Sequence, residues 1–519
     1  MKNNFNSLTD DSSRNFLILL KSILVGTTAG LAAVIFRKTL TYAEKASFLL
    51  YEYIKDNKTL IPILVVGLCV AGYFIGYLVS KNSMISGSGV PQVKGIMLGY
   101  FKGRKSWFHT LILKFIGGSI AILGGLSLGR EGPSIQIGAS IGEGIGNKMA
   151  KDRMERKILI ASGASAGLAA AFNAPLAGVI FALEEIFKYF SPTILLATMS
   201  AAVTADFISK TVFGLEPIFN FAISESIPLT SYGLLIILGF ILGIMGAFYN
   251  YVLIKTQQCY QKSKMFSVKL RPMIPLLFAG VLGILFPVVL GGGHRILEEL
   301  TPENGVKMLL LIFVIKFLFS MVSFGSGAPG GIFFPLLILG GTIGAIFAKI
   351  MIIYFGYDES FFNNFIILAM AGYFTAIVRA PITGIVLIME MTGSFSHMLS
   401  LSIVVITANV VADLVRSQPI YDNLLRNLIE KEMPTENRES SRKIIVEMLV
   451  SHGSQLENKQ VKMIKWPRKT LLVNVKRGED EMLPKGETEL KAGDYLHILT
   501  DCNNEWKTRE KLEEMNAHL

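Results

Sequence analysis

A charged pair stands in the middle of an otherwise apolar stretch, where residues 129–134 read Gly-Arg-Glu-Gly-Pro-Ser. Each charge at the centre of a membrane helix costs about 2.5–3.5 kcal/mol on insertion scales, so Arg130 and Glu131 need a reason to be there. The glycines and Pro133 favour a helix that begins here, because proline fits the first helical turn. A helix that begins inside a membrane directs free amides at a buried cavity and can hold an ion. The alternative is a structural ion pair between Arg130 and Glu131.

Two further Gly/Pro turns have the same character. Residues 87–91 read Gly-Ser-Gly-Val-Pro, and residues 325–335 read Gly-Ser-Gly-Ala-Pro-Gly-Gly-Ile-Phe-Phe-Pro. An anion deep in a membrane is best held by uncharged donors, which also release it, and helix N-termini supply such donors. We therefore expect the Ser88 hydroxyl and the amides of Ile332 and Phe333 to face an anion, with a helix beginning near the last proline. Each turn alone is more typical of an ordinary loop.

Two adjacent acids and one isolated cation are the other polar residues within apolar runs. Glu184 and Glu185 end the run 176–183, and Lys114 lies inside another. Adjacent helical side chains point about 100° apart, so one carboxylate can face a cavity and the other another surface. The alternative is a pair of interfacial charges that closes a helix. Lys114 is either a buried cation that attracts anions or a packing support.

The composition around these residues is that of a membrane protein. Of 519 residues, 51% are hydrophobic and 17% charged, whereas soluble domains carry about 25% charged residues. Several apolar segments approach the ~20 residues that span a bilayer, and shorter ones are broken by Gly or Pro. The first is too long for a signal-peptide core, and we interpret it as a retained helix. The segments are 16–36, 60–79, 111–128, 191–212, 234–254, 273–290, 308–324, 332–353 and 399–415.

The net charge is +11. Positive-inside loops at 148–157 and 255–271 account for most of it, and a positive field at pore mouths would concentrate anions. We expect no nucleic-acid partner, because no basic patch is interleaved with aromatic residues. The cysteines Cys69, Cys259 and Cys502 are too scattered for a metal site or a disulfide framework. No cofactor is expected.

The chain contains an internal repeat. Eight residues between 114 and 142 recur 202 positions later, and four residues between 174 and 184 recur 206 positions later. The matches include Lys, Phe and Glu as well as the Gly and Pro that are frequent in membrane helices. We therefore predict duplicated halves, roughly 15–215 and 230–425, with a site at their interface near the membrane midplane.

Beyond the repeat the composition becomes charged and strand-like. A membrane domain over residues 1–430 is expected to be followed by a polar linker, 431–443, and a small α+β domain, 444–519. Its predicted strands and turns lie at 444–450, 470–475, 477–478, 492–494 and 495–499.

The three turns resemble those of the CLC family of chloride channels and proton-coupled chloride transporters. The family pattern reads Gly-Ser-Gly-x-Pro, Gly-Arg-Glu-Gly-Pro and Gly-x-Phe-x-Pro, found here in order at 87–91, 129–133 and 331–335. Tyr421 occupies the place of the family's late tyrosine. The resemblance covers roughly residues 15–430. It implies an all-α polytopic membrane protein with two inverted repeats of broken helices, assembled as a homodimer with one anion pathway per subunit.

The resemblance also implies roles for individual residues. Glu131 corresponds to the gate, whose carboxylate fills the anion site when ionised and swings out when protonated. The chemistry agrees, because an ionised carboxylate competes with an anion and a neutral one does not. Glu185 matches the proton-transfer acid of the exchangers, with Glu184 beside it, and the family's channels generally lack this acid. The implied ligands of a central chloride are Ser88, Ile332, Phe333, Tyr421 and Arg130.

Two residues depart from the family pattern. Gln92 stands where Glu is frequent, and Phe334 stands where small residues are common. Neither departure removes an expected ligand. Ser88, in place of Pro or Met, implies a preference for chloride over nitrate or fluoride.

The tail resembles a TrkA-C domain, a small ligand-binding module of potassium-uptake regulators, over about residues 444–502. Such domains dimerise and some bind cyclic dinucleotides, so a cyclic dinucleotide or another nucleotide is the expected ligand; the alternative is a dimerisation domain without one. Basic residues that could meet its phosphates are Arg468, Lys469, Lys476 and Arg477. The tail also implies a bacterial plasma-membrane protein with a cytoplasmic C-terminal domain.

Three functions remain open from the sequence: a chloride/proton antiporter, a passive gated chloride channel, and a cation transporter of the kind the tail suggests. Cation transport would need acidic or carbonyl-lined sites, whereas the turns offer donors. Enzyme chemistry is weaker still, because His109, His294 and His397 are scattered and are expected in loops. The sequence favours the antiporter.

Overall fold

The computed structural model describes residues 2–101, 106–219, 221, 227–262, 267–432, 443–478, 480–501 and 505–517, with side chains from residue 15 onward except 431–432. The chain divides into two compact units, Met1–Arg426 and Asn427–Leu519. Most of the expected linker, residues 433–442, and Cys502 lie outside the described residues.

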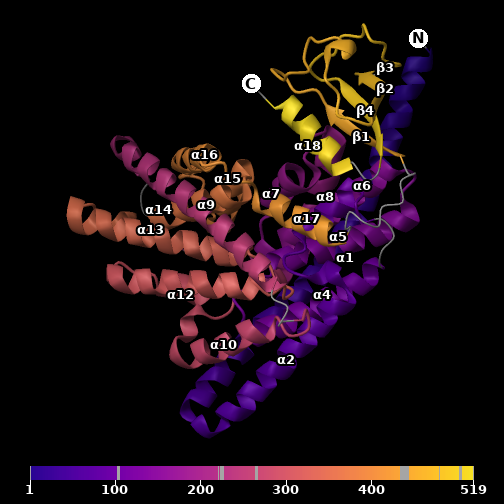
Figure 1. Cartoon of the computed structure of the whole chain (residues 1–519). Coiled ribbons are helices and arrows are strands. Elements are labelled where there is room, and N and C mark those ends of the chain that lie inside the picture. Colours follow the sequence, from indigo (N-terminus) through magenta and orange to yellow (C-terminus); the bar gives the residue numbers. More distant parts are fainter. Residues whose placement is uncertain are drawn as a thin grey trace. The chain divides into compact units, whose positions relative to one another are not determined.

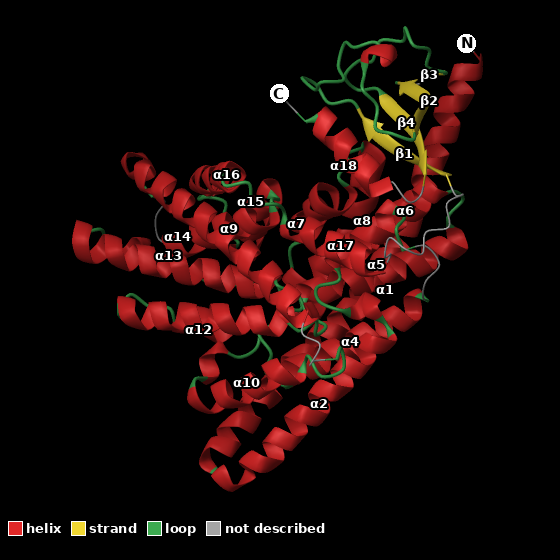
Figure 2. Ribbon diagram, in the orientation of Figure 1, coloured by secondary structure: helices red, strands yellow, loops and turns green. Residues whose placement is uncertain are grey.

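The larger unit is built from helices (Figures 1 and 2). Its first half contains α1 (Lys2–Asp56), α2 (Ile61–Lys81), α3 (Val90–Leu98), α4 (Trp107–Leu123), α5 (Glu131–Met149), α6 (Arg153–Phe172), α7 (Pro175–Phe181) and α8 (Pro192–Phe213). Its second half contains α9 (Tyr232–Lys262), α10 (Met273–Leu285), α11 (His294–Glu299), α12 (Val306–Gly325), α13 (Phe333–Phe355), α14 (Phe362–Val378), α15 (Pro381–Thr392) and α16 (Met398–Leu414), and α17 (Ile420–Glu432) follows. Among the described residues, seven helices are long and apolar enough to cross a membrane.

The expected helical membrane architecture is confirmed, and α5 begins at the helix start expected at 129–133. None of the expected apolar segments covered the length of α5, α6 or α14. Gly138 of α5 and Gly163 of α6 lie so close that a Cβ on either would overlap the other's backbone. The apolar window of α14 is 89% buried. Helices surrounded by protein need no broad lipid-facing surface, and small residues let their backbones approach closely. α5 and α6 therefore lack an uninterrupted apolar run, whereas α14 is apolar enough to be found by a search for such runs.

The two halves meet at the helix starts that the sequence singled out. Gly129 and Gly331 form an isolated antiparallel bridge. The amide of each donates to the carbonyl of the other, at 2.7 Å in both directions. The two glycines are equivalent in the repeat, and a local two-fold relation between the halves produces this reciprocal pairing. The bridge joins the segments that lead into α5 and α13.

The smaller unit has an antiparallel sheet of order β1-β4-β2-β3. Its core includes Val446, Val475, Leu496 and Ile498, all buried. The predicted α+β fold is confirmed, although a three-residue strand and a polar terminal helix gave no sequence signal. The elements are β1 (Lys443–Leu449), β2 (Thr470–Arg477), β3 (Asp480–Met482), β4 (Tyr495–Asp501) and α18 (Glu505–Asn516).

Candidate ion-binding site

Two helices begin beside the glycine bridge. Glu131 is the first residue of α5, and Phe333 is the first residue of α13 with Ile332 as its N-cap. The helix expected to begin near Pro335 begins two residues earlier, at Phe333. Pro335 falls within the first turn instead, where its missing amide hydrogen costs nothing because those amides have no intrahelical partner. The free amides of two helix N-termini therefore lie at the junction of the two halves.

The carboxylate of Glu131 occupies this junction. The side chain is fully buried, and its oxygens lie beside its own amide and that of Phe334. Neither oxygen reaches hydrogen-bond geometry with any residue that the structure describes. Arg130 Nε is 3.8 Å from Oε1, a long contact, and also has no hydrogen-bond partner in the described part. The carboxylate thus lies where two helix dipoles favour a negative charge, with only a loose ion pair.

Two buried hydroxyls adjoin the first turn of α5. Ser88 precedes α3 and Tyr421 is the second residue of α17, and both are almost completely buried. A Cβ placed on Gly132 would overlap Ser88 Oγ, which fixes how closely the serine approaches α5. The hydroxyls of Ser88 and Tyr421 approach each other, and neither has any other hydrogen-bond partner within the described chain. Buried hydroxyls are normally bonded, so these two are available donors.

Aromatic rings fix the start of α13. The ring of Phe333 lies 4.7 Å from that of Phe374, 5.2 Å from Phe172 and 5.9 Å from Phe181, measured between centroids. Phe181 also meets Tyr421 edge-on at 6.3 Å. This apolar packing holds the amide of Phe333 and the hydroxyl of Tyr421 in place. It also lowers the local dielectric, which strengthens the donors that remain.

A buried lysine braces the loop that carries Ser88. Lys114 Nζ donates to the carbonyls of Ile85 and Gly87, at 2.9 and 2.5 Å. Lys316 makes two equivalent bonds in the second half. The sequence left the role of Lys114 open between attracting anions and supporting the packing. Its bonds give it a bracing role behind the loop that carries the serine.

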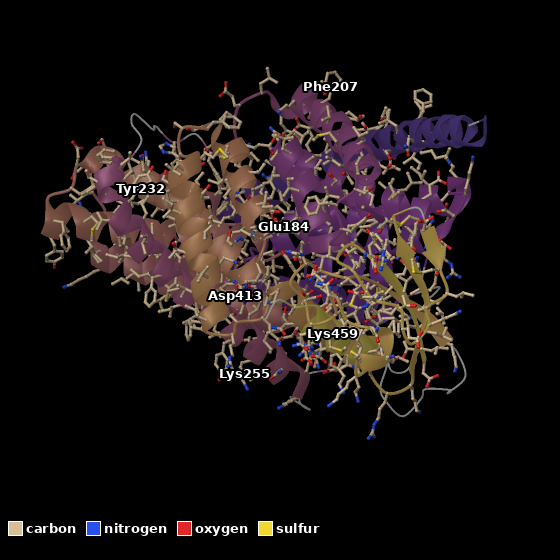
Figure 3. The ribbon with its side chains drawn as sticks, turned by 90° about the horizontal axis from the view of Figure 1, so that it is seen from above. Glu184, Phe207, Tyr232, Lys255, Asp413 and Lys459 are labelled. Atoms are coloured by element: carbon tan, nitrogen blue, oxygen red, sulfur yellow. The ribbon has the colours of Figure 1, made fainter. Side chains whose placement is uncertain are left out.

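Glu184 lies where helices of the first half meet those of the second (Figure 3). It accepts hydrogen bonds at the N-terminus of α15, from the hydroxyl of Thr383 at 2.7 Å and from the amide of the same residue at 2.8 Å. In return, Glu390 accepts hydrogen bonds at the N-terminus of α7, the nearest from Ala177 at 2.8 Å. The two glutamates are equivalent in the repeat. Glu184 caps α15, the helix that carries Glu390, and Glu390 caps α7, the helix that precedes Glu184.

Glu185 points to a different set of partners. The turn Ala182–Phe187 is π-helical, a form that recurs at functional sites. Glu185 is buried and accepts a hydrogen bond from Lys94 Nζ at 2.8 Å. Lys94 also pairs with Asp422, which Lys188 contacts at 3.1 Å. Sequence reasoning missed Lys94 and Asp422, although an available signal was that Lys94 is three residues after Pro91 and Asp422 directly follows Tyr421.

The three histidines singled out in the sequence were expected in loops. His109 is inside α4, so its expected place in a loop is wrong. His294 begins α11 and stacks on Phe334 at 3.9 Å, and His397 is the N-cap of α16. Within the described ranges, no group of His, Cys, Asp or Glu could hold a metal ion.

In the smaller unit, one of the expected phosphate contacts is already engaged. Arg477 Nε and Nη2 donate to the two carboxylate oxygens of Asp494, each at 2.7 Å. Burial opposes the ionisation of Asp494, but hydrogen bonds from Arg477 and the Lys491 amide outweigh it and lower the pKa of this carboxyl. Arg477 therefore stabilises the turn after Leu490 and is a poorer phosphate ligand than the sequence suggested.

Comparisons with known proteins agree with these two units. Residues 71–413 match the family model described as voltage gated chloride channel, and residues 445–511 match that of the TrkA-C domain. The chain is 34% identical over 447 residues to the H(+)/Cl(-) exchange transporter ClcA of Vibrio cholerae, covering 83% of this chain and 94% of the relative. It is 33% identical over 440 residues to that of Citrobacter koseri, covering 82% and 92%.

Solved structures share the fold. A slow cyanobacterial Cl-/H+ antiporter superposes with a TM-score of 0.75 at 29% identity, covering 81% of this chain and 99% of the other. A eukaryotic CLC transporter superposes with a TM-score of 0.67 at 23% identity, covering 80% and 75%. A CLC-type fluoride/proton antiporter gives 0.64 at 23% identity, covering 79% and 97%.

Proposed function

This chain belongs to the voltage-gated chloride channel (CLC) family, and we propose that it is a secondary active antiporter that exchanges chloride for protons across a membrane. The observation that carries the proposal is the Glu131 carboxylate, buried between the N-termini of α5 and α13 without a hydrogen-bonding cation. A group that fills an anion site with its own negative charge excludes chloride until it takes up a proton. Its titration therefore ties chloride movement to proton movement.

Chloride binds in the space that the carboxylate leaves. The hydroxyls of Ser88 and Tyr421 and the amides of Ile332 and Phe333 donate to it, and Arg130 raises the local potential from one side. Neutral donors hold an anion without trapping it, which a transport site requires. The assignment is supported because neither hydroxyl has a hydrogen-bond partner other than its neighbour among the described residues.

Glu185 is the second proton carrier and exchanges protons with Glu131 along the interior. Its burial and its separate position support that role, because a buried acid needs a functional reason. Glu184 is left out of the proton route, since its carboxylate is taken up by the cap on α15. A passive channel has no use for a second buried acid, and this favours exchange.

The wider assignments rest on the family. The protein is a multi-pass homodimer of the bacterial plasma membrane, with residues 1–430 transporting the ions and residues 444–519 forming a cytoplasmic regulatory domain. Residues 431–443 connect them. The tail binds a cyclic dinucleotide or another nucleotide. This ligand can alter transport only to the extent that its affinity differs between two states of the protein.

The reversal potential of the purified protein in planar bilayers tests the antiporter directly. At a fixed chloride gradient, a pH gradient should move the reversal potential away from the chloride equilibrium value. A reversal potential that ignores pH would instead identify a passive channel. For the tail, calorimetry of the full chain with cyclic dinucleotides should give saturable heat, and flux should change in parallel; absence of both would leave the tail without this ligand.

A further inference from the structure

A buried lysine, Lys94, contacts two acids. One is Glu185, the proposed proton carrier, and the other is Asp422, which directly follows the proposed anion ligand Tyr421 in the sequence. Lys94 is 3% exposed, and its Nζ lies 2.8 Å from Glu185 Oε1 while also contacting Asp422. Glu185 is equally buried, whereas the side chain of Asp422 is 33% exposed. An ammonium withdrawn from water this far is held by its two carboxylates.

The charges around Glu185 come from three elements. Lys94 faces it from α3, Asp422 from α17, and Lys188 from the end of its own π-helical turn. The hydroxyl of Tyr421 is a further titratable neighbour. The two lysines and two acids balance when all are ionised, so a proton on Glu185 leaves the cluster with one excess positive charge. Lys188 is half exposed, so water screens its charge. The excess positive charge is therefore left mainly on the buried Lys94.

The position of Lys94 connects this cluster to the anion site. Lys94 lies in the first two turns of α3, the short helix that directly follows Ser88. Asp422 directly follows Tyr421 in α17. One ammonium therefore bridges the proton acid and the helices next to both proposed hydroxyl ligands.

We propose that Lys94 is a positioning residue of the exchange cycle, which sets the pH at which Glu185 accepts a proton and passes that change through Asp422 to the helices beside Ser88 and Tyr421. This inference rests on the proposed antiport function. When Glu185 is ionised, Lys94 is shared between two carboxylates. When Glu185 is protonated, Lys94 turns to Asp422 alone and pulls α3 and α17 closer together.

The proposal predicts shifts of opposite sign. Replacing Lys94 by Gln removes the cation that favours ionised Glu185, so proton-coupled flux should reach half-maximum at a pH higher by about one unit or more. Asp422→Asn removes the carboxylate that competes with Glu185 for Lys94. Lys94 then stabilises ionised Glu185 more strongly, so the pH of half-maximal flux should be lower. A role in packing alone would lower flux in both variants without opposed shifts.

The test is a titration of proton and chloride flux against internal pH in proteoliposomes. Lys94→Arg keeps the charge and should restore most of the normal profile. Lys21→Gln is the control, because Lys21, which is partly exposed, pairs with the buried Glu155 at 2.5 Å and neither residue contacts Lys94, Glu185 or Asp422 in the described structure. It should leave the pH of half-maximal flux unchanged.

Each outcome decides a separate question. If the unaltered protein moves chloride without protons, the proposed antiport function fails. If it couples normally but Lys94→Gln follows the same pH profile, or if both variants shift in the same direction, only the role of Lys94 is overturned. Should Lys94→Gln fail to assemble, the sign of the Asp422→Asn shift decides alone.

Discussion

The two halves of the membrane unit have the same backbone at their meeting point but different side chains. Gly129 and Gly331 pair with each other and each leads into a helix. The residue two positions on is Glu131 in the first half and Phe333 in the second. The duplicated backbone thus supplies donors from both sides, and only one half adds a titratable acid.

The same contrast holds at the second acid. Glu184 and Glu390 are equivalent and perform the same capping. The next residue is Glu185 in the first half and Met391 in the second. The two halves therefore share the backbone scaffold, but only the first half carries the two acids of the proposed proton transfer. The hydroxyl of Ser88 is also confined to the first half, since the loop braced by Lys316 continues with Gly292.

The largest expected effect is at Glu131. Glu131→Gln should abolish proton coupling completely while chloride still moves, because a neutral amide neither cycles a proton nor competes as an anion. Simultaneous recording of chloride efflux and external pH from proteoliposomes measures both. Glu390→Gln, which changes an acid of the second half that only caps α7, is the control and should keep coupling. Proton movement that persists in Glu131→Gln would remove this residue from the gate.

Loss of proton transport is also expected for Glu185→Gln. The amide keeps the shape and a bond toward Lys94 but cannot carry a proton. Met391→Gln places the same side chain at the equivalent position in the second half and should leave the proton-to-chloride ratio unchanged. Equal losses of proton transport in the two variants would contradict the proposal that only the first half carries protons.

A change of selectivity is expected at Ser88. Ser88→Pro removes a hydroxyl donor, and a compact, strongly hydrated anion loses more from this than a larger, weakly hydrated one. The chloride/nitrate permeability ratio from reversal potentials should fall several-fold. Gly292→Ser, which adds a hydroxyl at the corresponding place in the second half, should not raise it. An unchanged ratio in Ser88→Pro would place the anion elsewhere.

The smallest effects concern the shared caps. Glu184→Gln and Glu390→Gln should each destabilise the protein by about 1 kcal/mol, the usual cost of a lost helix cap. Thermal unfolding in detergent should therefore give two similar decreases in melting temperature, while the proton-to-chloride ratio stays normal in both. A ratio altered by Glu184→Gln alone would return this residue to the proton route.

The motifs made the helix starts, Ser88 and the two acids predictable, because turns of Gly and Pro leave a local signal in the sequence. The partners of those residues were not predictable. Lys94 and Asp422 are 328 positions apart, and nothing local indicates that they share one cluster. Likewise α14 looks like any apolar segment, since its burial depends on the helices around it.

One measurement tests the central claim most directly. Vesicles containing the unaltered protein are loaded with chloride, diluted into low chloride at equal pH on both sides, and followed with an external pH electrode. The account predicts proton movement opposite in direction to chloride, driven against a growing pH gradient and absent from Glu131→Gln vesicles. Chloride efflux with no pH change in the unaltered protein would contradict it.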